Sequence, residues 1–92
     1  MNEQRQGIFE RALAAALELQ TRYPDSRPLS SAIEQLTYLL AVTRNEQPAD
    51  MSKIATINIG IIAAKEVEDM DEQVAELLHQ AAAQAREMTK AG

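Results

Sequence analysis

The chain has 92 residues, no cysteine and a formal charge of −5 at neutral pH. This length is typical of one domain with a single modest core, and the negative charge opposes non-specific binding to nucleic acid. The lack of cysteine excludes disulfides and thiolate chemistry, and no apolar run approaches the roughly 18 residues of a membrane span. We therefore expect one helical domain over residues 1–92 in the cytoplasm, with no secretory signal and neither nucleic acid nor membrane as a partner.

The first half of the chain shows the spacing of two helices. Apolar residues recur at three- and four-residue steps in residues 3–22 and again in residues 28–43, as on the buried face of a helix. Asn2 is a suitable N-cap for the first helix, and Tyr23-Pro24 ends it because the residue before proline avoids the helical region. Tyr38 flanks the apolar face of the second helix, so its hydroxyl needs water or a polar partner.

Residues 51–67 are the most ambiguous segment. Its isoleucines partly alternate as in a strand, but no second strand is present to pair with it. The segment also fits a continuous helix, with Ile59 and Ile62 away from the main stripe and Gly60 allowing close approach of a neighbouring helix. The residues predicted to form the buried stripe are Ile54, Ile57, Ile61, Ala64 and Val67.

The caps of the last two helices can be read from the sequence. Asp50 or Ser52 is expected to cap the third helix, and Asp71 a fourth helix over residues 72–89. The predicted core face of this fourth helix comprises Val74, Leu77, Leu78, Ala81, Ala85 and Met88. Because the connections are short, neighbouring helices should run antiparallel. The sequence thus predicts an all-α fold, a small four-helix antiparallel bundle.

Few residues in the chain suit catalysis. His79 is the only histidine, it has no cysteine or distinctive serine motif beside it, and the glycines are isolated. Glu76-x-x-His79 is half of a di-iron carboxylate signature, but only one copy is present. Leu77 and Leu78 are expected to take the buried face, which turns Glu76 and His79 toward water. We therefore predict a protein that is not an enzyme, with no catalytic, cofactor-binding or metal-binding residues.

The strongest charge pattern lies between the third and fourth helices. From Glu66 to Glu76 the chain carries six carboxylates and no basic residue. A solvated helix end with a negatively charged first turn accounts for Asp71 and Glu72. The alternative is a patch complementary to a basic partner. The residues alone favour the first interpretation.

Four stretches, taken together in their order and spacing, favour the second interpretation, a patch for a basic partner. They are Glu10-Arg11-Ala12-Leu13, Arg22-Tyr23-Pro24, Ser31-Ala32 through Gln35-Leu36 to Tyr38, and Gly60-Ile61-Ile62-Ala63-Ala64-Lys65-Glu66 followed by Asp71. Over about residues 8–78 the chain resembles the small helical immunity proteins of bacterial type VI secretion, which neutralise toxins that hydrolyse NAD(P)⁺. The resemblance implies a cytoplasmic antitoxin that occludes the active site of a secreted toxin domain.

An acidic inhibitor would complement the positive charge of a cleft that holds a dinucleotide. The expected partner contacts are Glu66, Glu68, Asp69, Asp71 and Glu72, with Tyr38 as an aromatic anchor. Lys65 is the alternative partner of these carboxylates, within the chain itself. Other functions stay open: a non-catalytic adaptor, a self-associating bundle, or immunity against a different nucleotide-targeting toxin. Whether the free protein forms homo-oligomers is also open.

Overall fold

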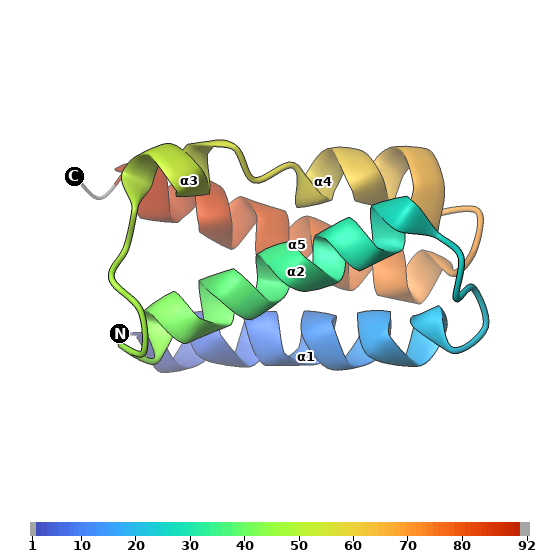
Figure 1. Cartoon of the computed structure of the whole chain (residues 1–92), viewed down its shortest axis with the longest axis horizontal. Helices are drawn as coiled ribbons and strands as arrows, with labels where there is room; N and C mark the ends of the chain where they lie inside the picture. Colours follow the sequence, from blue (N-terminus) through green and yellow to red (C-terminus); the bar gives the residue numbers. More distant parts are fainter. Residues whose placement is uncertain (1, 91–92) are drawn as a thin grey trace.

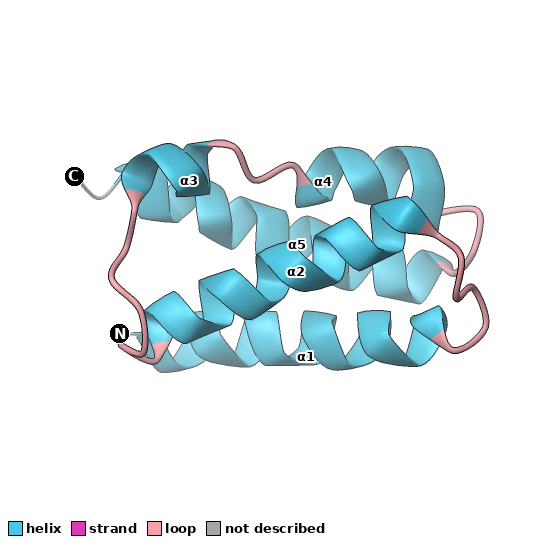
Figure 2. Cartoon of the chain, viewed as in Figure 1, coloured by secondary structure: helices cyan, strands magenta, loops and turns pink. Residues whose placement is uncertain are grey.

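The computed structural model describes residues 2–90, which form four antiparallel helical segments (Figures 1 and 2). Three segments are single helices, and the third consists of two short α-helices and a π-helix. The elements are α1 (Asn2–Gln20), α2 (Arg27–Thr43), α3 (Met51–Ala55), α4 (Ile59–Ile62), η1 (Ala63–Val67) and α5 (Glu72–Lys90). No strand occurs in this part of the chain, so the all-α four-helix prediction is confirmed.

The core lies between the apolar faces of these segments. α1 packs on α2 and α5, while α4 and η1 cover α5 from the other side (Figure 1). The largest fully buried side chains are Phe9, Leu19, Leu29, Leu36, Leu39, Ile59, Val67 and Leu78. Burying a side chain of this size contributes roughly 1.5–3 kcal/mol, so these contacts dominate the favourable side of folding. Most of this core comes from α1, α2 and α5, including Phe9 and Leu19 of α1 and Leu29, Leu36 and Leu39 of α2.

The ends of the helices follow local chemistry. α1 ends at Gln20, two residues before the predicted boundary, and the connection passes through Pro24. Asp50 caps α3 by accepting hydrogen bonds from the backbone N–H groups of Ser52 and Lys53. The Tyr38 hydroxyl finds its polar partner, because it accepts a hydrogen bond from the Asp50 N–H. The side chain of Asn2, the predicted cap of α1, lies outside the part that the structure describes.

The prediction of one continuous helix over residues 51–67 is wrong. The helix ends at Ala55, and Thr56–Asn58 connect it to α4. The Gln35 side chain binds this connection from α2, accepting from the Asn58 N–H at 2.9 Å and donating to the Asn58 side-chain oxygen at 2.7 Å. The break is therefore stabilised by a tertiary contact that gives the Asn58 backbone a partner outside any helix. β-branched residues at the break further weaken its helical preference.

The break changes which isoleucines are buried. Ile59 and Ile62, expected beside the stripe, lie in the core, and Ile61, expected within it, is 58% exposed. Ala64 is also exposed rather than buried. The phase changes because the helix restarts after the break and then widens into the π-turns of η1. A continuous 3.6-residue period across the segment therefore assigns these side chains to the wrong faces.

Gly60 permits a close approach between α4 and α5. A Cβ atom on Gly60 would lie 3.2 Å from the Cβ of Ala82, closer than ordinary van der Waals contact. The predicted role of this glycine is confirmed, and Ala82 is the residue that faces it. In residues 2–90 no helix combines the length and the hydrophobicity that crossing a bilayer requires.

Candidate partner-binding surface

The acidic cluster (Glu66, Glu68, Asp69, Asp71 and Glu72) lies at the end of the bundle where α1 ends and α2 begins (Figure 1). It covers η1, the turn after it and the start of α5. All its members are exposed except Asp71, which is half-buried. The fold thus gathers these carboxylates on one surface.

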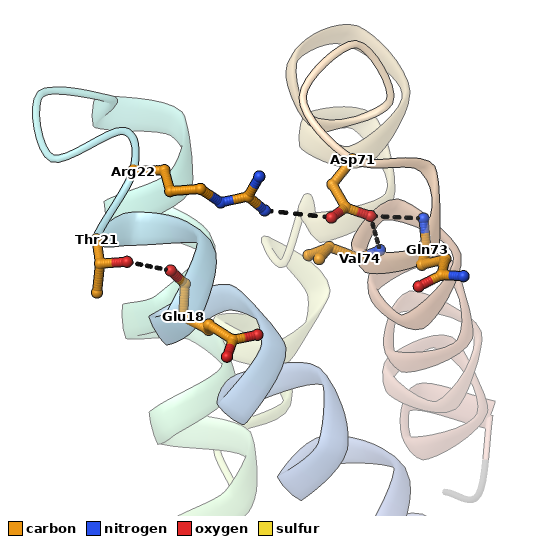
Figure 3. A network of polar contacts seen from close by, with 6 residues as sticks. All are labelled: Glu18, Thr21, Arg22, Asp71, Gln73 and Val74. Atoms are coloured by element: carbon orange, nitrogen blue, oxygen red, sulfur yellow. Dashed lines mark hydrogen bonds and ion pairs between the residues drawn. The ribbon is translucent and has the colours of Figure 1, made fainter.

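Asp71 already has three partners within the chain. Its carboxylate accepts hydrogen bonds from the backbone N–H groups of Gln73 and Val74, which caps α5 as predicted. Arg22, just beyond α1, reaches across to it with an N–O distance of 3.2 Å (Figure 3). The Val74 N–H, followed by Arg22 and Gln73, lowers the pKa of Asp71 below its ordinary value. Asp71 therefore holds the ends of two helices together at this surface.

Glu68 also has a partner, since its carboxylate lies 3.0 Å from Nε2 of His79 on α5. Both side chains are partly exposed. His79 therefore contacts Glu68 in the preceding turn, and not Glu76 of its own Glu-x-x-His motif. Within residues 2–90 no group of three or more acidic, histidine or cysteine side chains is arranged to hold a metal ion.

Three members of the cluster, Glu66, Asp69 and Glu72, form no ion pair with any residue that the structure describes. We call them the unpaired acidic group. Each is exposed, and Glu72 shares a shallow depression with Glu68, Glu76 and His79. These side chains carry negative charge that no ion pair with a described residue compensates. They can meet a basic partner without first breaking a contact within the chain.

Tyr38 lies apart from the acidic cluster. Its ring is covered by Lys53, whose Nζ lies 4.2 Å from the ring centroid, and its hydroxyl contacts Asp50. These residues belong to α3 and its cap, at the opposite end of the third segment from η1 (Figure 1). The structure therefore does not bring Tyr38 together with the carboxylates.

Lys65, considered as an internal partner of the carboxylates, forms no ion pair with a described residue. It lines a hollow of about 360 Å³ between the start of α2 and α4, together with Arg27, Glu66 and Ile61. A second hollow, of about 570 Å³, lies between α4 and α5 on the other side of Ile61. An exposed isoleucine thus stands between two hollows, next to the acidic cluster.

Sequence reasoning placed Ile61 in the core and so missed it as a surface residue. Asn58, a residue type that favours helix starts, was the available signal that a new helix begins after it. Thr56 and Ile57, both β-branched, were a weaker signal of a break.

Comparisons with known proteins identify relatives of this chain. Residues 4–87 match the model of the Tsi6 family. The immune protein Tsi6 of Pseudomonas aeruginosa is 33% identical over 73 residues, which is 79% of this chain and 77% of that protein. A chain in the structure of Tse6 in complex with Tsi6 superimposes with a TM-score of 0.85 at 28% identity, covering 95% of this chain and 92% of that one. The structure of Tsi6 from Pseudomonas aeruginosa gives 0.80 at 30% identity, covering 88% and 83%.

Proposed function

The chain belongs to the Tsi6 family, and from this membership we propose that it is an immunity protein that binds a secreted toxin domain and occludes its active site. The family is one of immunity proteins, so the prediction that the chain is not an enzyme is confirmed. The observation that carries the proposal is the likeness, over nearly the whole chain, to a chain in the complex of Tse6 with Tsi6.

The proposed target is a type VI secretion toxin that hydrolyses NAD(P)⁺, and the proposed site of action is the cytoplasm of the producing cell. The sequence resemblance supports this chemistry. The acidic cluster agrees with it, because a cleft that binds the phosphates of a dinucleotide offers positive charge and amide donors. A negatively charged inhibitor is attracted by that field, which raises the association rate.

Within the proposed interface the unpaired acidic group (Glu66, Asp69 and Glu72) is the main electrostatic contact. Glu68 contributes together with His79, and Asp71 acts mainly by holding α5 in place. Tyr38 is the least supported of the proposed contacts because its hydroxyl and ring already have partners near α3. An interface that includes both the cluster and Tyr38 has to extend along the whole third segment.

Co-expression tests the proposal. An immunity gene is expected beside its toxin gene, so the toxin gene sought there is expressed alone and together with this chain, while growth and cellular NAD⁺ are measured. We expect loss of NAD⁺ and growth arrest with the toxin alone, rescue of both with the pair, and co-purification of the two proteins. Rescue of growth from a toxin that leaves NAD⁺ intact would retain the immunity role but reject the NAD⁺ chemistry. Failure to rescue and to co-purify would reject the immunity role itself.

A further inference from the structure

Ile61 is the most exposed of the large apolar side chains described, at 58% of its full accessibility. Leu17, Tyr23 and Met51 are the others, and none of them lines either hollow beside α4. Ile61 differs because it lines both, so it forms an apolar ridge with a depression on each side. Single exposed apolar residues are ordinary, but a ridge between two hollows has the shape of a docking feature.

Specific contacts hold Ile61 in this position. Gln35 fixes Asn58 through two hydrogen bonds, and α4 begins directly after Asn58. Gly60 lies against Ala82 of α5, and the neighbouring Ile59 is fully buried. These contacts position the backbone of Ile61 so that its side chain points outward. A β-branched side chain has one strongly preferred χ1 rotamer in a helix, so it loses little conformational entropy on binding.

The charges around Ile61 restrict the kind of partner. Arg27 and Lys65 line the hollow on the α2 side, and neither forms an ion pair with a described residue. Glu66 lines the same hollow and belongs to the unpaired acidic group. The ridge therefore has two cations on one side, Arg86 lining the hollow on the other side, and the acidic cluster next to it. A surface that fits it needs an apolar recess with carboxylates at the rim, close to a basic area.

We propose that Ile61 is the apolar anchor of the toxin interface, inserting into a recess of the toxin domain whose rim carboxylates face Arg27 and Lys65. This inference rests on the proposed function and adds a contact that charge alone does not supply. An interface usually combines a dry apolar centre with a polar rim, and buried anchors at the centre carry most of the affinity. The acidic cluster governs the association rate, whereas Ile61 governs how slowly the complex dissociates.

Binding kinetics with the purified full-length chain test this inference. The probe is the toxin domain of the co-expression test, carrying a substitution that abolishes its activity. Ile61→Ala is compared with wild type and with Leu17→Ala, which removes a similar exposed side chain from α1. We expect Ile61→Ala to weaken binding about 30-fold or more, mainly through faster dissociation, while Leu17→Ala stays within about twofold. Arg27→Ala with Lys65→Ala should weaken binding by a smaller factor.

Three results would overturn the inference, and they are distinguishable. If wild type binds the toxin, Ile61→Ala binds equally well and both have the same oligomeric state, Ile61 is not the anchor, although the proposed function stands. If wild type does not bind, the proposed function fails and this inference fails with it. If toxin binding is unchanged but light scattering shows a wild-type dimer that Ile61→Ala abolishes, the ridge binds a second copy of the chain. Circular dichroism confirms that each variant is folded, as expected for changes at exposed positions.

Discussion

Replacing Gly60 with alanine tests how strongly the contact between α4 and α5 limits this fold. Two effects oppose each other. Alanine favours a helix over glycine by up to about 1 kcal/mol, less at a helix start such as Gly60, the second residue of α4. Against this, the new Cβ would lie 3.2 Å from the Cβ of Ala82, and no rotamer change can move either atom away. One helix must therefore shift by a few tenths of an ångström.

The packing cost should exceed the gain in helix propensity. Forcing extra volume into a packed core costs about 1–3 kcal/mol, so we expect a net destabilisation of roughly 1–2 kcal/mol. For a domain of this size that corresponds to a fall in Tm of about 4–16 °C. The reverse change on the facing helix, Ala82→Gly, is destabilising by itself at about 1 kcal/mol, but in the double variant it makes room for the new methyl group.

A double-mutant cycle measured by urea unfolding separates these contributions. We expect a favourable coupling of about 1–2 kcal/mol between Gly60→Ala and Ala82→Gly, because residues in contact do not behave additively. Gly60→Ala should also weaken toxin binding, since the shift moves the neighbouring Ile61. The reasoning is refuted if Gly60→Ala raises the free energy of unfolding, because helix propensity would then outweigh the close contact.

Three further predictions concern the polar contacts. Gln35→Ala should lower the free energy of unfolding by about 1–2 kcal/mol and speed amide hydrogen exchange at Asn58; unchanged exchange would reject its role at the break. Because the pKa of Asp71 is lowered in the folded state, its charge stabilises the fold above its ordinary pKa and loses this effect as pH falls through the folded value. The stability gap between wild type and Asp71→Asn should therefore shrink below about pH 4 in acid titrations, and a constant gap would contradict this. Reversing the unpaired acidic group to lysine should slow association with the toxin domain and flatten its salt dependence, and kinetics like those of wild type would place the interface elsewhere. The control reverses three exposed carboxylates away from this end of the bundle, Glu34, Glu46 and Glu87, of which Glu87 alone has an ion-pair partner among the described residues, Lys90 at 3.9 Å.

The accuracy of sequence reasoning differed between elements for physical reasons. α1, α2 and α5 each keep one helical period along their length, so their buried faces could be read directly from the spacing of apolar residues. The cap at Asp71 was also predictable, because it depends on residues two and three positions away. These helical periods and this cap depend on residues a few positions apart, so they can be predicted from the sequence.

The contacts that sequence reasoning missed join residues far apart in the chain. Gln35 and Asn58 are 23 residues apart, and Arg22 and Asp71 are 49 apart. No spacing rule connects such pairs, since the fold must exist before they meet. The acidic cluster could be predicted as a group of exposed carboxylates. Which of its members already have partners within the chain could not.

The prediction that Ile61 is buried was wrong, and the reason concerns more than the position of a helix boundary. Sequence-level rules fail most often where function, rather than stability of the free chain, decides the residue. At 58% exposure, Ile61 gains the full free energy of burial only if something covers it. The break fixed by Gln35 turns this side chain outward between two hollows, with cations on one side and carboxylates nearby. Contacts within the chain account for the break, whereas the exposed isoleucine is accounted for by a partner that covers the ridge.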